Sequence, residues 1–232
     1  MKTILTVMLL TVAGSMTTKT HAQTDYTMKV GDFSELKVTD AINVDYKCSA
    51  DSAGYVCFNC PSELASALIL SSKGRTLTVQ VSTEAIGLKN LPRVTVYSRF
   101  LTKVFNSGDS TVRVLSVADT PRFEASLENN GSIVVRNVRA NEVKANLKFG
   151  HGHLVITGEC GKAVFGLAGT GVIEADGLKA DEVKISASGT GSIGVWAEKE
   201  LSVYGVGSTS IYYKGNPEIK KRSIGMTPKP IQ

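Results

Sequence analysis

The chain has 232 residues, 42% of them hydrophobic and 20% charged, which is the composition of an ordinary globular protein with one sizeable core. Its formal net charge is +5, but the basic residues are scattered singly and aromatic residues amount to only 6%. The sequence contains neither a basic patch nor a set of stacking platforms, so we expect no nucleic-acid partner.

The N-terminus has the features of a secretory signal peptide. Lys2 is followed by a short, mostly apolar stretch and then by small and polar residues up to Ala22. The apolar stretch is too short to span a bilayer, and no later stretch approaches the length of a transmembrane helix. We predict a signal peptide over residues 1–22 and an exported protein, in the periplasm or at the cell surface, with one domain over residues 23–232.

Up to about residue 107 the sequence is rich in β-type runs but irregular. The runs "GDFSELKVTDAINVDYKC", "RTLTVQVS" and "PRVTVYSRFLTKVFN" are separated by a candidate short helix, "PSELASAL", and by an irregular excursion, "STEAIGLKNLPR". Because the terminal units of a repeat protein must cap its stack, we predict wider, less regular coils here. A separate N-terminal sandwich is the alternative.

Four cysteines, Cys48, Cys57, Cys60 and Cys160, lie in a chain predicted to be exported, where structural disulfides form. The stretch "CFNCP" has the C-x-x-C spacing of redox enzymes. However, no βαβ pattern surrounds it and the short helix begins after its second cysteine, so we do not expect redox catalysis. Strand alternation turns Cys48 and Cys60 inward and Cys57 outward, which counts against a clasp between Cys48 and Cys57. A structural bridge is expected, but its pairing stays open.

From Gly108 onward, a small cluster rich in Gly, Ser and Thr returns about every 20 residues. The third residues of the six clusters, at successive spacings of 21, 21, 19, 20 and 18, are Ser110, Gly131, Gly152, Gly171, Gly191 and Thr209. A period of this length is typical of stacked solenoids. The glycines are explained by the sharp corners of such a coil, since none precedes a helix or the Lys-Ser/Thr pair of a phosphate-binding loop.

Each cluster is followed by a short strand with one apolar face. Two residues after the third position stands an aliphatic column: Val112, Ile133, Leu154, Ile173, Ile193 and Ile211. Two residues further on, a second column is mostly apolar, while the column between them is not. Copies of such a strand stacked in register would form aliphatic ladders along a solenoid axis. The pattern therefore predicts a parallel β-helix with regular rungs over about residues 100–215.

The order of several motifs resembles a known bacterial family. The stretches "GDFSELKVTDAINVDYK", "LTVQV", "SGDSTV", "SGTGSIGV" and "GSTSIYYKGNPEI" follow one another as in the family called putative auto-transporter adhesin, head GIN domain, which is common in Bacteroidetes. The resemblance covers about Gly31 to Gly225 and brings no catalytic residues. It implies an exported, all-β protein folded as a right-handed, single-stranded parallel β-helix with a less regular N-terminal capping part. The rung containing Phe149 holds one extra residue, which predicts a local bulge.

His151 and His153 flank Gly152 and, on an extended segment, would project to the same side, as two metal ligands would. The local sequence offers no third ligand, although an acid from a neighbouring rung could supply it. We therefore predict exposed turn histidines, no metal site and no cofactor.

Acidic residues occur about once per rung at differing columns: Asp109, Glu128, Glu142, Glu159, Glu174, Asp176, Asp181, Glu182 and Glu198. Glu142 and Glu182 each begin an "EVK" and could stack in a row across rungs. Some parallel β-helices are polysaccharide lyases or hydrolases that use clustered carboxylates, so such an enzyme is the alternative reading. We interpret these acids as solvated turn charges and expect no catalytic residues.

The repeat preserves shape while its outward columns vary. Outward hydroxyls could form a row suited to hydrogen bonding with sugars, although small polar residues are also what tight corners prefer. These residues are Thr170, Thr190, Ser192, Ser208 and Ser210. We predict a non-enzymatic, exported adhesin-like or envelope scaffold module that presents a β-helix surface to a glycan or a cell-surface protein.

Overall fold

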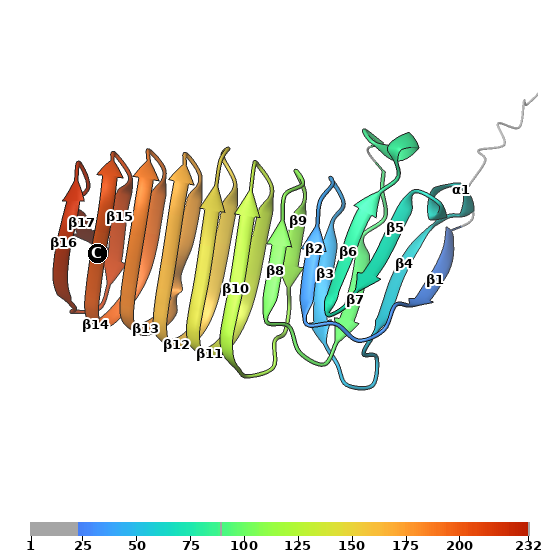
Figure 1. Cartoon of the computed structure of the whole chain (residues 1–232), viewed down its shortest axis with the longest axis horizontal. Coiled ribbons are helices and arrows are strands. Elements are labelled where there is room, and N and C mark those ends of the chain that lie inside the picture. The colour runs from blue at the N-terminus through green and yellow to red at the C-terminus, as the bar shows by residue number, and fades with distance from the viewer. Residues whose placement is uncertain (1–22, 89, 232) are drawn as a thin grey trace, which may run out of the picture.

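The computed structural model describes residues 23–88 and 90–231, and the predicted signal peptide over residues 1–22 lies outside them. Within the described residues, 17 strands join into one continuous sheet that winds into a solenoid of about six turns (Figure 1). The predicted parallel β-helix is confirmed. No helix in this part of the chain has the length and apolar character needed to cross a bilayer.

The strands follow one another with only two short helical interruptions. They are β1 (Gln23–Lys29), β2 (Glu35–Val38), β3 (Val44–Cys48), β4 (Tyr55–Pro61), β5 (Leu68–Lys73), β6 (Thr76–Val81), β7 (Val94–Ser98), β8 (Lys103–Asn106), β9 (Thr111–Val114), β10 (Thr120–Glu128), β11 (Ser132–Lys148), β12 (His153–Gly169), β13 (Val172–Gly189), β14 (Ser192–Gly207), β15 (Ser210–Lys214), β16 (Glu218–Ile224) and β17 (Pro228–Pro230). Helix α1 (Ser62–Ala65) lies within the predicted helical stretch, and a 3-10 turn, η1 (Thr83–Ala85), lies within the irregular excursion.

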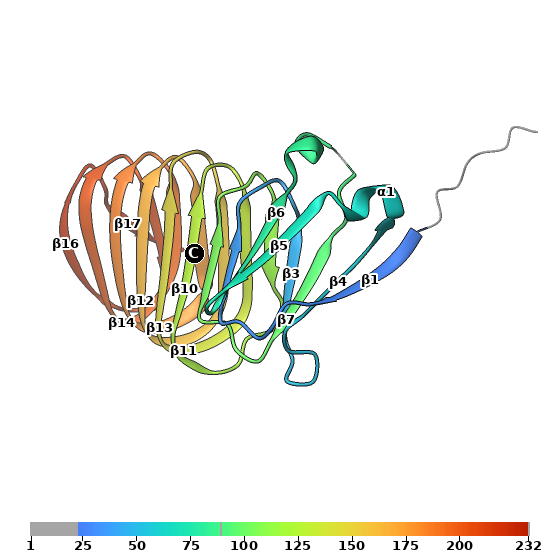
Figure 2. The same ribbon diagram turned by 45° about the vertical axis from the view of Figure 1, so that its right-hand side comes forward.

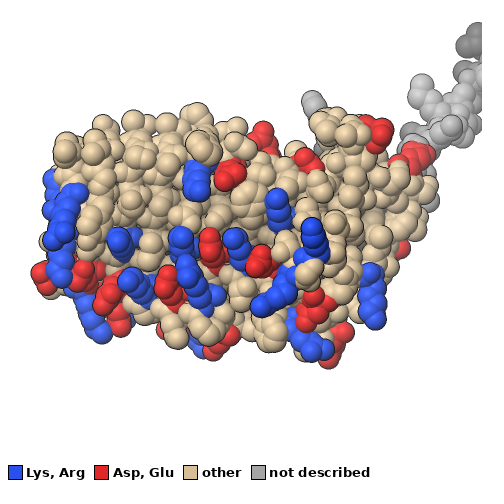
Figure 3. All heavy atoms as spheres, viewed as in Figure 1, with Lys and Arg blue, Asp and Glu red and all other residues tan. Residues whose placement is uncertain are grey.

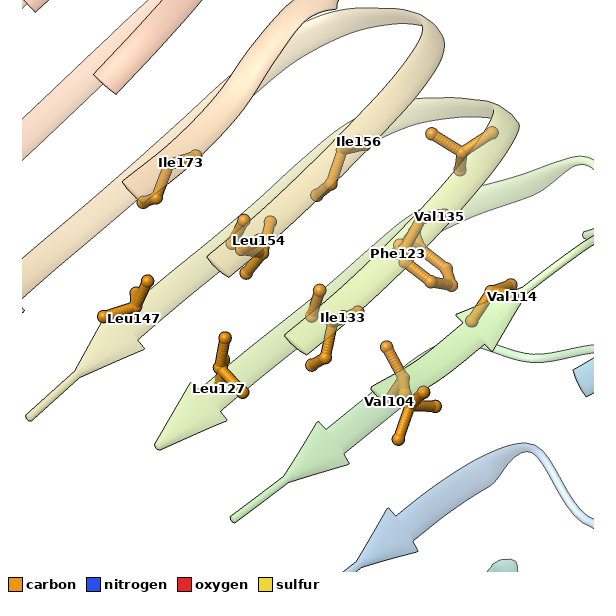
Figure 4. Close-up of a cluster of buried hydrophobic side chains, with 14 of the residues drawn as sticks. Val104, Val114, Phe123, Leu127, Ile133, Val135, Leu147, Leu154, Ile156 and Ile173 are labelled. Carbon is orange, nitrogen blue, oxygen red and sulfur yellow. The ribbon is translucent and has the colours of Figure 1, made fainter. Parts of the chain in front are cut away.

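The regular part of the solenoid is built from β11 to β14, each of which is a bent strand that makes most of one coil. Each pairs in parallel with the next, so that Leu154 aligns with Ile173, Ile173 with Ile193, and Ile193 with Ile211. These side chains are at most 1% exposed. The predicted aliphatic column therefore stacks like on like along the axis, as Leu154 and Ile173 do in Figure 4. Hydrogen-bonded strands lie about 4.8 Å apart, which brings such side chains into contact.

The corner glycines stack in the same way. Gly189 has a φ of +152°, and a Cβ there would clash with the carbonyl oxygen of Gly169 in the preceding coil. Only glycine tolerates both the dihedral angle and the close approach, which explains why the clusters recur.

The N-terminal coils are less regular, as predicted, but their order along the axis differs from their order in the sequence. Strand β2 pairs with β6 and β8, and β3 pairs with β7 and β9, so the first coil lies inside the stack. Strands β4 and β5 then pair antiparallel with β7 and β6, and β1 pairs antiparallel with β4 as the outermost strand on its side (Figures 1 and 2). Strands β4 and β5, which cover this end of the stack, therefore precede in sequence the strands β6 to β9 that complete the coils next to them.

The extra residue predicted near Phe149 is confirmed, and it lies in a corner. Lys148 aligns with Ala168, and His153 aligns with Val172. The corner between the aligned positions therefore holds residues 149–152 in this coil and only residues 169–171 in the next. Phe149 takes up the excess with a φ of +61° and leaves its side chain 64% exposed.

Candidate functional site

The upper edge of the solenoid in Figure 1 is formed by the corners that follow β10 and the equivalent parts of β11 to β14. Because Gly169 aligns with Gly189 and Gly189 with Gly207, the next residues form one row across three coils: Thr170, Thr190 and Ser208. Ser192 aligns with Ser210 and starts a second row beside the first. The register thus brings together the five hydroxyls singled out in the sequence.

These hydroxyls divide into two groups. The Oγ1 of Thr170 donates a hydrogen bond of 2.9 Å to the carbonyl oxygen of Gly150, which is the corner-packing role that the sequence also allowed. In the described part of the chain, no hydrogen bond is made by the hydroxyls of the other four residues, Thr190, Ser192, Ser208 and Ser210. Thr190, Ser208 and Ser210 are exposed, so their hydroxyls are available to a ligand.

The rows end at a small hollow near the C-terminal end of the solenoid. It has a volume of about 180 Å³, and its lining includes Ser208, Ser210, Tyr212, Thr227 and Lys229. Such a volume is below the range of drug-sized pockets, so the hollow fits the edge of one small polar ring. Its lining combines hydroxyls, an aromatic ring that is 41% exposed, and a cation. We call the rows and this hollow together the hydroxyl edge.

A wider, shallow groove lies just below this edge on the sheet that contains β10 and β16. It measures about 480 Å³, and small residues such as Gly166, Ala168, Ser186 and Ser188 form much of its lining. Because residue 168 directly precedes the corner at 169–171, the groove is continuous with the hydroxyl edge. Figure 3 shows that the upper part of this face carries few charges, whereas its lower part carries bands of both signs.

Another groove follows the opposite, lower edge and is polar. It measures about 750 Å³ and is lined by one corner segment from each of four coils: residues 119–121, 139–141, 159–161 and 179–181. Its lining includes Glu159 and Asp181, both among the acids considered for catalysis.

Of the three acids that line the groove, Asp119, Glu159 and Asp181, the last two are engaged with bases of neighbouring coils. Arg139 Nε lies 3.0 Å from Glu159 Oε1, and Lys199 Nζ lies 3.1 Å from Asp181 Oδ2. The groove also contains Cys160, where burial raises the pKa of the thiol to about 12, which suppresses its thiolate at neutral pH. This pairing favours a structural role for the acids over a pair of catalytic carboxylates.

Glu142 and Glu182 occupy one row, as predicted, but Lys162 stands between them. Acids and bases alternate over the first four positions of this row, from Arg122 to Glu182. At its C-terminal end the row continues with Glu200 and Glu218, so three acids follow one another on adjacent coils. The middle one, Glu200, is paired with Lys220 at 2.7 Å.

The two turn histidines differ in their contacts. The backbone N–H of His151 donates to Asn130 Oδ1 at 3.0 Å, and His153 Nε2 lies 3.0 Å from Glu174 Oε1 in the next coil. An acid from a neighbouring rung thus does reach one of them. Within residues 23–88 and 90–231, no group of three or more His, Cys, Asp and Glu residues could hold a metal ion.

The expected structural disulfide is not formed. All four cysteines are free. On β4, Cys60 is buried and Cys57 faces outward, as predicted, which explains why the C-x-x-C pair forms no disulfide. Residues three apart on a strand point to opposite faces, so their sulfur atoms cannot meet. The same geometry does not fit a thioredoxin-like site.

A buried carboxylate held by two half-exposed arginines lies on the sheet formed by β3, β7 and β9, and no sequence pattern indicated it. The carboxylate of Asp45, only 9% exposed, accepts hydrogen bonds from Arg93 Nη1 at 2.9 Å and from Arg113 Nε at 2.7 Å, and Arg113 Nη2 bonds its other oxygen. Burial would raise the pKa of Asp45, but the hydrogen bonds and charges of Arg113 and Arg93 outweigh it and hold this pKa below its usual value. The three residues meet only because the coils are stacked out of sequence order.

Comparison with known proteins now adds the family. The profile of the family described as putative auto-transporter adhesin, head GIN domain, matches residues 32–217. The chain belongs to this family. The resemblance seen in the sequence is thereby confirmed, and this head GIN domain covers most of the described residues. A search of curated proteins finds no match.

Solved structures share the fold. A putative adhesin from Bacteroides fragilis is 24% identical, with a TM-score of 0.77 over 90% of this chain and 96% of that one. A putative adhesin from Parabacteroides distasonis is 19% identical, with a TM-score of 0.74 over 91% and 98%. A putative lipid binding protein from the same species is 20% identical, with a TM-score of 0.70 over 90% and 97%. At these identities the likeness establishes the fold alone.

Proposed function

We propose that the protein is a non-enzymatic, exported adhesin-like or envelope scaffold module that uses its hydroxyl edge to bind a glycan. The family and two of the related structures are described as putative adhesins, which supports an exported or surface role. The observation that carries the glycan proposal is the row of unbonded hydroxyls leading to the hollow lined by Tyr212 and Lys229.

The chemistry of this edge suits a sugar. Hydroxyls both donate and accept hydrogen bonds, as a sugar requires, and an exposed aromatic ring offers a flat apolar face. The adjoining groove has small residues over which a chain of sugar rings could lie. Binding would be weak at each coil and would gain strength from the repetition of the row along the axis.

The alternative function, a β-helix lyase or hydrolase acting on polysaccharides, would use the lower groove. The exposed surface pairs of Glu159 with Arg139 and of Asp181 with Lys199 assign a catalytic role to neither acid, so this alternative has no specific support. An assay for reducing ends or unsaturated sugars released from a panel of glycans tests this alternative directly.

The glycan proposal is tested on an array of bacterial and host glycans with residues 23–232. A double variant, Ser208→Ala with Ser210→Ala, removes two hydroxyls from the edge. Each lost hydrogen bond costs about 1 kcal/mol, so binding to the best glycan should weaken about 30-fold. The matched control, Ser71→Ala with Ser72→Ala, removes two exposed serines from β5 at the other end and should bind as the unmodified protein does.

A protein that binds no glycan on the array would contradict the proposal. Equal weakening of the two double variants would show that binding does not use the hydroxyl edge.

A further inference from the structure

The excess positive charge of the protein is concentrated at one end. Residues 210–232 contain five basic residues and one acidic residue, whereas residues 23–209 contain 19 basic and 20 acidic residues. The net charges are therefore +4 and −1. Figure 3 shows basic side chains gathered at the end where Figure 1 places β16.

Part of this charge has no partner in the protein. Lys214 pairs with Asp176 at 2.8 Å and Lys220 pairs with Glu200 at 2.7 Å. Lys221 Nζ donates only to the hydroxyl of Thr227, at 3.1 Å. Among the described residues, neither Lys221 nor Arg222 makes an ion pair, and both are exposed on β16.

Apolar side chains are exposed at the same end. They are Tyr212 at 41%, Ile219 at 41%, Ile224 at 71% and Ile231 at 37%. Ile219 aligns with the buried Leu201, so it covers the end of the core. Ile224 follows Arg222 on β16 by two residues and therefore lies on the same face of the strand.

Protection of the sheet edge explains only some of these residues. Pro228 and Pro230 in β17 remove backbone donors, and the lysines of β16 repel a neighbouring strand, which together prevent edge-to-edge pairing. These devices work without exposed isoleucines, which would themselves promote association. Unpaired cations beside exposed aliphatic side chains match instead an anionic bilayer, where cations meet lipid phosphates and aliphatic groups enter the headgroup layer.

We propose that the C-terminal end of the solenoid, formed by β16 and β17, docks on an anionic membrane surface. The outer edge of β16 meets the membrane, so that Arg222 from one face of the strand and Lys221 from the other contact lipid phosphates. Ile224 enters the headgroup layer, while Ile219 covers the end of the core. The occupant is a lipid surface rather than a soluble polyanion, because a polyanion would make no use of Ile224. This attachment goes beyond glycan binding. It would hold the long axis away from the membrane, with the row of Thr170, Thr190 and Ser208 along the side of the solenoid and the hollow at the end nearest to the bilayer.

Co-sedimentation of residues 23–232 with vesicles measures this docking. The unmodified protein should bind vesicles that contain phosphatidylglycerol and should not bind pure phosphatidylcholine vesicles. Each basic residue near an anionic surface contributes about fivefold to the affinity, so Lys221→Gln with Arg222→Gln should weaken binding about 30-fold. The matched control is Arg136→Gln with Lys148→Gln, which removes the same two residue types from exposed positions on other coils and should change binding less than about twofold.

A second pair of variants tests the apolar contribution. Ile224→Ser should weaken vesicle binding at least about fivefold, whereas Ile86→Ser, which alters a 68% exposed isoleucine in the N-terminal half, should have no effect. The proposal is overturned if the unmodified protein ignores anionic vesicles or if both charge variants weaken binding equally. It is also overturned if soluble polyphosphate competes fully and Ile224→Ser binds normally, which would mean that the end binds polyanions. Lys221 contacts the hydroxyl of Thr227 in the hollow, and Lys148 lines the adjoining groove, so glycan binding is measured separately in Ile224→Ser, which alters neither lining.

Discussion

Replacing Ile173 with aspartate should unfold the protein. Ile173 is fully buried in β13 and lies between Leu154 and Ile193 in the aliphatic column. Truncation to alanine at such a site costs about 2–5 kcal/mol, and a buried, unpaired carboxylate costs several kcal/mol more. Because domains are stable by only about 5–15 kcal/mol, the aspartate variant should lose its cooperative fold, while Ile173→Ala should fold with a lowered midpoint of urea denaturation.

The matched control is the next residue. Glu174 faces outward, its side chain is 53% exposed, and its ion pair with His153 is a surface contact. Glu174→Lys should therefore change the free energy of unfolding by less than about 1 kcal/mol. Urea denaturation followed by circular dichroism compares the three variants. Similar losses of stability in Ile173→Ala and Glu174→Lys would refute the assignment of inward and outward columns.

Two further predictions concern buried groups. Asp45→Asn should lower the free energy of unfolding at neutral pH, because Arg93 and Arg113 lose their buried partner. The pKa of Asp45 in the folded protein is lowered from 3.8, so the carboxylate stays charged there as the pH falls. The difference in unfolding free energy from the unmodified protein should therefore persist down to about pH 3.8 and shrink as the pH falls further. A difference that disappears near pH 6 would contradict this. Iodoacetamide should not alkylate Cys60 and Cys160 until urea is added, because burial raises the pKa of both thiols. Rapid labelling of either cysteine in the folded protein would show that its thiol is accessible to the reagent.

The sequence was sufficient for the regular coils because their order in the chain is also their order in space. The spacing of Ile173, Ile193 and Ile211 placed each of them in one column, and the structure aligns them one on another. The extra residue at Phe149 was also visible, because the interval from Gly131 to Gly152 is 21 residues and the next, to Gly171, is 19. Periodicity suffices wherever each unit contacts only its neighbours.

The N-terminal coils were not predictable in this way. The alternation in β2 and β3 places Leu36 and Val44 inside, but it does not indicate which coils lie above and below them. That order follows from long-range pairing with β6 to β9, and it alone brings Asp45 to its two arginines. Local patterns carry no information on such contacts.

The candidate site was predicted in part. The outward hydroxyls were found from the repeat, but Thr227 and Lys229, which complete the hollow, were not singled out. A further copy of the strand is present, in which Pro228 aligns with Ile211 and Pro230 with Tyr213 at an interval of 17 residues. It was obscured in the sequence because prolines replace the apolar residues of the earlier copies.

The most direct test of an exported module that binds a partner is its location in the native cell. Intact cells are treated with a protease, and the protein is followed by immunoblotting, with a periplasmic protein as the control for integrity. The adhesin-like proposal predicts that the protein is accessible to antibody and cleaved on intact cells while the periplasmic control survives. Protection on intact cells, with digestion only after the outer membrane is permeabilised, would contradict a surface adhesin-like role.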